Sequence, residues 1–393
     1  MKRFLSILIT GMLPLAAQPS PDLSSFAFRL LEQAAPNGNA CLSPWSLATA
    51  LAMAEAGAGG ETKAEMATAL GFADADAWRA LAKTRIEPGE VVVHEGGKNV
   101  KVPAFELLAA NAAWASAGQA FAPAYLERLE RDFGAPLQRV DFTADRARQE
   151  INAWVAEQTK KRIPELFAPG SPARDSKLAL VNAVYLNASW ATAFPRSATR
   201  DADFHLDARD SAKVATMQLE DDLDHCALRH CRLVSLPYRG HSLAMVVAVP
   251  DEIDGAAAAA AELQSRLAKV QWSHGPVRLH LPRFELTEGY SLGSALGKLG
   301  MEKAFDKASA DFSGMTGGRD LYVSAVVQKT FFKVDEKATE AAAATGVVLG
   351  PTSAAIPQPR PLFVVRADRP FFFVVHDRKS GAILFVGRVS DPR

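Results

Sequence analysis

The sequence lacks a net charge, contains few cysteines, and has no long hydrophobic run beyond its first residues. Its 393 residues include 44 basic and 44 acidic side chains, so the formal charge is zero. This balance gives no reason to expect nucleic acid or an anionic membrane surface as a partner. No segment after residue 15 is apolar and long enough to form a membrane-spanning helix. The length suits one large domain or two small ones, and no linker or internal repeat divides it.

The first residues, MKRFLSILITGMLPLAAQ, have the layout of a secretory signal peptide. Lys2 and Arg3 precede an apolar run at residues 4–15, which is followed by two alanines. The apolar run is too short to span a bilayer. The sequence therefore predicts a signal peptide at residues 1–17 and a mature protein secreted to an extracellular or periplasmic location.

Only three cysteines occur, and two of them are close together. The stretch HCALRHC places Cys226 and Cys231 on either side of a four-residue gap, between two strand-like segments. Because export permits disulfides, a disulfide across the base of a hairpin ranks first, and two unpaired thiols rank second. A zinc site ranks third, since the spacing matches no common zinc motif. Cys41 lies in an apolar segment and is expected to be buried as a small hydrophobe. No metal and no cofactor are predicted.

The hydrophobic periodicity changes partway along the chain. Segments such as SPWSLATALAMAEAGAGG and ADRARQEINAWVAEQTKKR have helical spacing and helix end signals. Later segments, such as LALVNAVYLNASW and SLAMVVAVP, are β-branched or alternating. Helices followed by strands predict an α+β fold rather than a regular series of βαβ units.

The stretch GYSLG at residues 289–293 matches the G-x-S-x-G pattern of a serine hydrolase, with Ser291 as the nucleophile. Asp306 or Asp311, followed by His376, would complete the chain order of a catalytic triad. However, the parallel βαβ framework that holds such a nucleophile is absent from the pattern. A helix that starts near Ser291 is therefore the better interpretation.

The segment KATEAAAATGVVLGPTSAAIPQPRP at residues 337–361 precedes the last hydrophobic strands. As a helix it would be marginal, because GVVLGP stops it after only about ten residues. If the segment is read as a strand, in which side chains alternate between two faces, one face carries small side chains followed by apolar ones. The other face begins with a charged side chain. The first face consists of Thr339, Ala341, Ala343, Thr345, Val347 and Leu349, and the second begins with Glu340, Ala342 and Ala344. Prolines exclude the second half from a sheet interior. The segment is therefore interpreted as an exposed loop whose first half can become a strand.

The stretch VDEKATEAAAAT at residues 334–345 resembles the reactive-loop hinge of the serpins, the serine protease inhibitors. The similarity extends in the family's order over residues 39–66, 151–167, 178–194, 279–286, 296–305, 310–315, 368–375 and 384–389. It implies a single domain at residues 18–393, with three β-sheets, about nine helices and a reactive loop at about 336–366. It also implies a monomeric inhibitor that is not an enzyme. By the same resemblance, its partner would be a target serine protease, which would form an acyl-enzyme with the loop before the loop inserts into the main sheet.

The resemblance also implies roles for individual residues. The hinge would comprise Glu336, Ala338, Thr339, Glu340, Ala341, Ala342, Ala343, Ala344 and Thr345. The region where the central strands part would comprise Ser43, Ser46, Asn182 and Gln328, and the point where the loop enters would comprise Trp190 and Arg283. Arg283 and Glu336 match a basic–acidic pair whose loss is expected to favour premature opening and polymerisation.

Serpins usually place the residue that fills the protease's specificity pocket seventeen positions into the loop, counting the hinge glutamate as first. From Glu336 this count reaches Thr352, so the predicted reactive bond joins Thr352 and Ser353. A small β-branched residue suits a shallow pocket, which favours elastase-like or subtilisin-like proteases. Leu349, Ile356 and Arg360 are lesser alternatives.

The sequence departs from the family's pattern at three points. Ala338 replaces a usual glycine, and the lost backbone freedom is expected to slow insertion. Gln328 replaces a histidine found in many members, which removes a titrating group. The segment 352–370 is longer than in many relatives, which loosens the count to the reactive bond. A non-inhibitory serpin acting as carrier, chaperone or storage protein is the alternative function, and a hydrolase using Ser291 is a remote one. The alanine-rich composition suggests a bacterial-type member.

Overall fold

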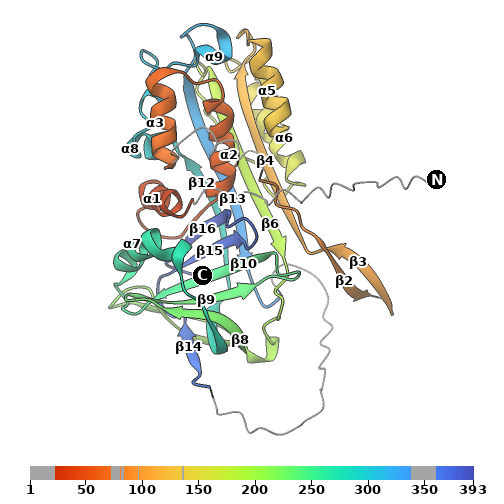
Figure 1. Ribbon diagram of the computed structural model, residues 1–393, viewed down its shortest axis with the longest axis vertical. Helices are drawn as coiled ribbons and strands as arrows, with labels where there is room; N and C mark the ends of the chain where they lie inside the picture. Colours follow the sequence, from red (N-terminus) through yellow and green to blue (C-terminus); the bar gives the residue numbers. More distant parts are fainter. Residues whose placement is uncertain (1–22, 72–79, 81–83, 96, 135–136, 338–359) are drawn as a thin grey trace, which may run out of the picture.

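The computed structural model describes residues 23–71, 80, 84–95, 97–134, 137–337 and 360–393. Within these residues it has eight α-helices and three β-sheets of nine, five and two strands (Figure 1). The predicted α+β fold with three sheets is thus confirmed, and the described helices number one fewer than the nine or so expected. None of the described helices is long and apolar enough to cross a membrane.

The five-stranded sheet runs along the long axis of the molecule, as Figure 1 shows. Its order is β12 (Phe284–Ser291), β13 (Val323–Val334), β6 (Leu178–Ala188), β4 (Phe105–Ser116) and β5 (Gln138–Val140). The central pair, β13 and β6, is parallel, whereas β12–β13 and β4–β6 are antiparallel. β6 is buried along almost its whole length, because helices cover the sheet on both faces. A strand buried on both faces has a near-continuous apolar sequence, which explains LALVNAVYL.

Two helices cover the five-stranded sheet on opposite faces. α2 (Pro44–Glu55) packs among the residues of the main core, which include Leu180 and Val326. α6 (Arg146–Gln158) belongs to a smaller core with Ala179 and Val181, the neighbours of Leu180 that point the other way. Ten of the twelve residues of α2 are buried, as expected for a helix that is apolar all round.

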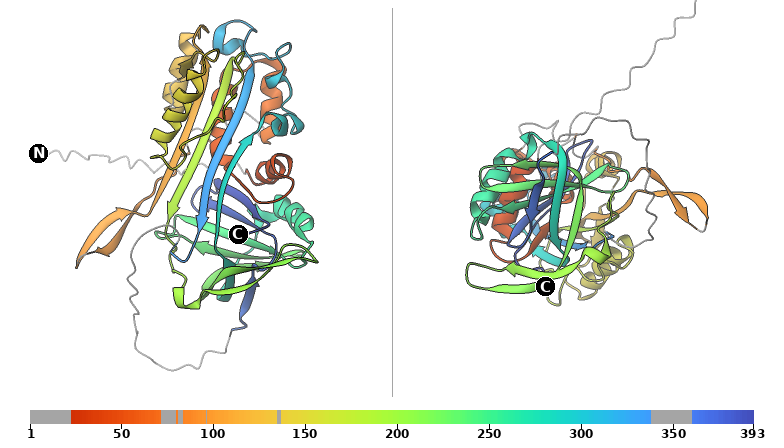
Figure 2. Two further views of the ribbon diagram at one scale, coloured as in Figure 1. Left: turned by 180° about the vertical axis from the view of Figure 1, so that it is seen from behind. Right: turned by 90° about the horizontal axis from the view of Figure 1, so that it is seen from below.

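The nine-stranded sheet lies across the other end of the molecule (Figure 2). Its strands are β1 (Ala40–Leu42), β16 (Ile383–Val389), β15 (Phe371–Asp377), β10 (Leu243–Pro250), β9 (Cys231–Pro237), β8 (Ser211–Ala227), β11 (Ser273–Pro282) and β14 (Phe363–Arg366) in this order, with β7 (Arg200–His205) beside β8. Aromatic rings join the two large sheets: Phe332 of β13 stacks on Phe373 of β15 with 4.7 Å between centroids.

The remaining elements surround these sheets. They are α1 (Ser24–Ala34), α3 (Gly60–Leu70), α5 (Pro123–Phe133), α7 (Ala256–Arg266), α8 (Gly293–Lys298), α9 (Ser313–Thr316) and the hairpin of β2 (Glu90–Glu95) and β3 (Lys98–Pro103). The hairpin projects from the body of the molecule (Figures 1 and 2). The sequence pattern did not predict it, nor did it predict β4.

The hydrolase alternative finds no support in the arrangement of its residues. Ser291 is the exposed last residue of β12, which pairs antiparallel with β13. His376 lies in β15 of the other large sheet. Asp311 accepts hydrogen bonds from Ser313 and pairs with Arg319. The pattern GYSLG therefore marks the end of a strand ahead of the short helix α8.

The predicted disulfide between Cys226 and Cys231 is absent. All three cysteines of the chain are free thiols. In the β8–β9 hairpin the residue opposite Cys226 is Leu233, so Cys231 is displaced diagonally by two positions. Diagonal neighbours lie about 7–8 Å apart, beyond the usual Cα separation of a disulfide of about 4.4–6.8 Å. The hairpin forms where expected, but its register leaves the two thiols unbonded. Cys41 is fully buried, as expected.

Candidate functional site

A buried network of amides and hydroxyls joins β13 to β6 and to the start of α2. Gln328 and Asn182 are register partners in the parallel pair, and Gln328 Nε2 donates to the side-chain oxygen Oδ1 of Asn182. Gln328 also accepts a hydrogen bond from the Ser43 backbone N–H at 2.8 Å and donates to the Ser43 carbonyl at 3.0 Å. None of these three residues is accessible to solvent. The network therefore ties both central strands to α2 without a titrating group.

The same network continues to β4 through a residue that the sequence did not indicate. The Asn182 amide donates to Ser46 Oγ and to Asn111 Oδ1, and Ser46 Oγ donates to Asn111 Oδ1 at 2.7 Å. Asn111 lies opposite Asn182 in the β4–β6 pair. Its role follows from strand register, and the only sequence signal is a polar residue within an alanine-rich strand.

We expect the Gln328→Ala substitution to lower the free energy of unfolding by about 3 kcal/mol. It removes a buried partner from Ser43 and Asn182, and each unsatisfied buried polar group costs about 1–3 kcal/mol. Urea unfolding would measure the change. Gln218→Ala is the matched control, because this partly exposed glutamine of β8 has only a 3.5 Å contact with Glu220. A loss at Gln328 no larger than that of the control would show that the network does not stabilise the sheet.

An ion pair holds Glu336, the first residue of the predicted hinge. Arg283 Nε donates to Glu336 Oε1 at 2.9 Å, and Thr199 Oγ1 donates to the same oxygen at 2.6 Å. Glu336 is 3% exposed, whereas Arg283 is about half exposed. Burial alone would raise the pKa of the Glu336 carboxyl, but the hydrogen bonds from Arg283 and Thr199 hold this pKa below its ordinary value. Glu336 is therefore charged at neutral pH.

Trp190 fixes the backbone beside this ion pair. Its indole N–H donates to the Asp335 carbonyl at 3.0 Å, and its ring stacks on Tyr238 at 4.6 Å between centroids. Phe194 N–H donates to the Glu336 carbonyl at 3.0 Å. The chain thus leaves β13 from an anchored position. Thr199, Phe194 and Tyr238 were not singled out from the sequence, because they reach the site only through folding.

The chain is anchored again where it re-enters the described structure. Arg360 pairs with Asp222 at 3.1 Å. β14 then joins the edge of the nine-stranded sheet in parallel with β11, and the Phe363 ring lies 4.4 Å from the His225 ring. The predicted hinge residues from Ala338 to Thr345 and the bond between Thr352 and Ser353 lie between these anchors, outside the described residues, as does the predicted signal peptide.

Comparison with known proteins gives consistent matches along the chain. The family model described as "Serpin (serine protease inhibitor)" matches residues 21–392. The leukocyte elastase inhibitor of Sus scrofa is 36% identical over 93% of this chain and 96% of its own length, and that of Homo sapiens is 34% identical over the same shares. Among solved structures, Serpin48 of the insect Tenebrio molitor superposes with a TM-score of 0.77 at 29% identity, over 94% of this chain and 96% of its own.

These comparisons contradict the predicted secretion. The relatives are leukocyte elastase inhibitors, which are intracellular serpins. The prediction depended on the composition of a short N-terminal segment, and a short basic and apolar run is weak evidence for a cellular address. The secreted location was therefore wrong. The same relatives are vertebrate proteins, so they give no support to a bacterial-type member.

The match covers nearly the whole chain, and the five-stranded sheet with its anchored strand ends agrees with it. It also removes the hydrolase alternative, because it assigns the chain to a family of inhibitors rather than enzymes. From residue 21 to residue 392, the chain belongs to the serpin family of serine protease inhibitors.

Proposed function

We propose that this serpin traps a serine protease covalently, by a loop that is cleaved and then inserts as a new strand between β6 and β13. The parallel pairing of these two strands carries the proposal. Eight residue pairs join them, from Val323–Leu178 to Phe331–Tyr185. A segment that leaves the C-terminal end of β13 and folds back would run antiparallel to both strands.

Such an insertion is favourable because antiparallel pairs are slightly more stable per residue than parallel pairs. One parallel ladder would be replaced by two antiparallel ladders, so the number of backbone hydrogen bonds would rise. Extended at about 3.3 Å per residue, the segment from Glu336 to Thr352 would span roughly 55 Å. This length is sufficient to pass along β13, which has 12 residues.

The buried network and the ion pair are proposed to hold the sheet closed until the loop is cut. Insertion must separate Gln328 from Asn182, and it must begin beside Glu336 and Trp190. Both positions are buried and hydrogen-bonded. These contacts therefore form an energy barrier to insertion of the loop. Cleavage frees one end of the loop, and the freed segment can then cross this barrier.

The proposed reactive bond joins Thr352 and Ser353, and the proposed targets are elastase-like or subtilisin-like proteases. The small side chain of Thr352 suits a shallow specificity pocket. The names of the relatives, leukocyte elastase inhibitors, favour the elastase-like class. We further propose a monomer that acts once, as a single domain at residues 18–393 with its reactive loop at about 336–366.

Incubation with an elastase-like serine protease, followed by a denaturing gel and intact mass analysis, tests the proposal. A complex that resists the detergent and a released peptide from Ser353 to Arg393 are expected. Thr352→Arg is the matched variant, because it should transfer inhibition from the elastase to a trypsin-like enzyme. Cleavage without a complex would contradict the inhibitory mechanism and favour a non-inhibitory or substrate-like serpin. A different fragment mass would move the bond.

A further inference from the structure

The projecting hairpin of β2 and β3 exposes two valines to solvent. Val92 is 61% exposed and Val100 is 39% exposed, and they are two of the four large hydrophobic side chains that are exposed among the described residues. The two strands pair only with each other, so neither outer edge has a described strand beside it (Figures 1 and 2). An exposed strand edge with apolar side chains is a surface on which another protein can dock.

Both faces of the hairpin offer aliphatic surface with little net charge. Val93 lies opposite Val100 on one face, and Val92 lies opposite Lys101 on the other. Lys101 pairs with Glu90 at 3.2 Å, so its charge is balanced within the hairpin. Such a surface suits an apolar patch on a folded protein, and it offers no cluster of cations to a polyanion.

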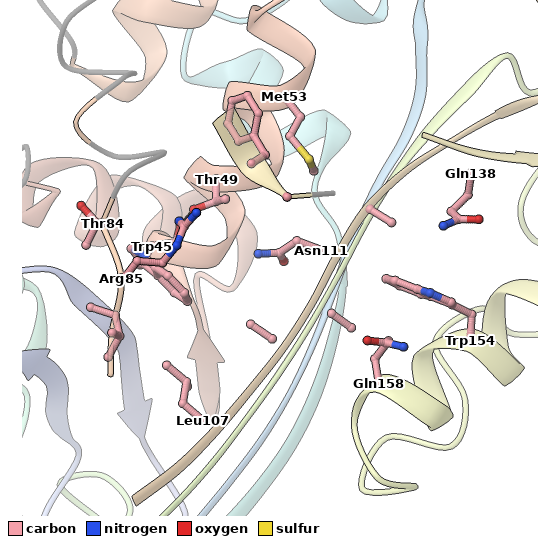
Figure 3. Close-up of a pocket in the computed structure, with 16 residues that line it drawn as sticks. Trp45, Thr49, Met53, Thr84, Arg85, Leu107, Asn111, Gln138, Trp154 and Gln158 are labelled. Carbon is pink, nitrogen blue, oxygen red and sulfur yellow. Dashed lines mark hydrogen bonds between the residues drawn. The ribbon is translucent and has the colours of Figure 1, made fainter. Parts of the chain in front are cut away.

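A two-stranded hairpin is only marginally stable by itself, and this one is held at its base. Val91 packs against the core that joins the two large sheets. A side-chain carbon at Gly240 would lie 2.8 Å from Ala104 Cβ and 3.2 Å from Val91 Cγ1, so the turn that contains Gly240 packs on the base of the hairpin. Figure 3 shows Arg85, which precedes the hairpin, on the same side of β4 as Trp45 of α2. The hairpin therefore projects from a fixed position.

The same turn joins the hairpin to the point where the predicted loop begins. Tyr238 accepts a backbone hydrogen bond across this turn from His241, and its ring stacks on Trp190. Trp190 in turn donates to the carbonyl oxygen of Asp335, next to Glu336. Only the turn and Trp190 thus separate the base of the hairpin from the chain that leaves β13.

The hairpin is long enough to reach a protease that attacks the loop. Each of its strands has six residues and extends about 20 Å. A globular protease of about 200 residues has a radius of gyration of roughly 16 Å, so its width exceeds the length of the hairpin. An enzyme bound to a loop that starts at Glu336 would therefore come within reach of the exposed valines.

We propose that the tip of the hairpin, which comprises Val92, Val93 and Val100, is a second contact site for the target protease, separate from the reactive loop. The proposal rests on the proposed function, because the occupant is the enzyme that the loop engages. The site takes an apolar, uncharged patch on the body of the protease. It strengthens the first, non-covalent complex, and it discriminates between proteases whose specificity pockets are alike.

Binding to an elastase whose nucleophilic serine is replaced by alanine tests the site, because no cleavage follows. Val92→Asp/Val100→Asp should raise the Kd by about tenfold or more, since it places two charges on apolar surface that the enzyme would cover. Ala227→Asp/Ala258→Asp is the matched control, because both alanines are exposed, in β8 and in α7. An equal Kd for the two variants would overturn the site.

A second variant separates the loss of contact from a folding defect. Val92→Thr/Val100→Thr keeps the shape of the side chains and the preference for a strand, and it should raise the Kd by about threefold or more. Circular dichroism melts compare its stability with that of the wild type. A raised Kd that appears only in a variant with a lowered Tm would assign the valines to the stability of the fold and overturn the site.

The active elastase distinguishes this site from the proposed function. The aspartate variant of the hairpin should form the covalent complex about tenfold more slowly, while the fraction of protease trapped stays that of the wild type, because the hairpin takes no part in insertion. A smaller trapped fraction at an unchanged rate would assign the hairpin to the sheet movement instead. If the wild type forms no covalent complex, the proposed function fails, but the Kd for the inactive elastase still decides the contact site.

Size-exclusion chromatography tests a second copy of the chain as the occupant. The wild type and the aspartate variant of the hairpin should elute alike, as monomers. A wild-type dimer that the variant separates would show that the valines join two copies, and it would overturn the assignment to the protease.

Discussion

The Ala343→Glu substitution is expected to convert the protein from an inhibitor into a substrate of its target protease. Ala343 lies on the face of the loop that is small and then apolar, and this face would be buried on insertion. Burying an unpaired carboxylate costs several kcal/mol, and about 3 kcal/mol corresponds to a factor of more than a hundred. Cleavage at Thr352 should continue, while the fraction of protease trapped as complex falls at least tenfold. Densitometry of a denaturing gel at several molar ratios measures both products.

Ala342→Glu is the matched control, because it places the same charge one position away on the opposite face. That face begins with Glu340 and would point to water. The control should retain most of the trapping. Equal losses in the two variants would mean that the alternation along the loop has no bearing on insertion, and the assignment of the two faces would be abandoned.

The Arg283→Met substitution is expected to lower the free energy of unfolding by about 2–3 kcal/mol. Breaking a buried ion pair from one side costs about 3–5 kcal/mol, and a smaller value is expected here because Arg283 is about half exposed. Glu336 would stay buried with Thr199 as its remaining side-chain partner. The freed strand end should also promote polymers on mild heating. Urea unfolding and size-exclusion chromatography after heating measure the two effects.

Two further variants separate this ion pair from surface electrostatics. Arg278→Met removes the partner of Glu220, but both side chains are exposed, so it should cost less than about 1 kcal/mol. The double variant Arg283→Met/Glu336→Gln should recover part of the loss, since it removes the uncompensated charge. A double variant as unstable as the sum of its single changes would show that the charge of Glu336 is not the cause.

The contribution of this pair should also depend on pH with a definite sign. The pKa of Glu336 in the folded protein lies below its ordinary value of 4.5. A group with a depressed pKa contributes its full stability above the unfolded value and loses it as the pH falls through the folded value. The difference in stability between the wild type and Arg283→Met should therefore be constant near neutral pH and shrink below about pH 4.5. A difference that grew on acidification would contradict the assigned pKa direction.

Strand β6 and the helices α2 and α6 were predictable from the sequence, whereas β4 was not. β6 reads LALVNAVYL, an apolar run that only a strand or a buried helix can use. β4 contains FELLAANAAWAS, which is rich in alanine and leucine, and these residues favour helices in isolation. Eleven residue pairs with β6 override that preference. The small side chains of Ala110 and Ala112 let α6 pack closely on the strand, so the same alanines that conceal the strand in the sequence allow the layers to form.

In the hairpin that contains Cys226 and Cys231, the local sequence pattern predicts the turn but not the pairing register of the two strands. The sequence predicted a turn between two strands, and a turn is present. The pairing register of β8 and β9 depends on which side chains point into the core, and both Cys231 and Leu233 are buried there. Since register follows from packing rather than from spacing, the bond between the two thiols could not be read from the sequence.

The family, the α+β class and the alternation of small and charged residues at 339–345 can be read from the sequence alone, and the bond between Thr352 and Ser353 stays a prediction from the same source. These properties can be read from the sequence because hydrophobic periodicity and motifs are contained within short, continuous segments of the chain. Tertiary structure alone decided that β13 and β6 run parallel side by side and that Gln328 meets Asn182 across 146 positions of sequence. It likewise decided that Glu336 is held by Arg283 and Thr199, and that Asn111 joins β4 to the central network. Such contacts depend on which distant strands become neighbours, and that choice is set by the burial of whole faces against α2, α6 and the second sheet.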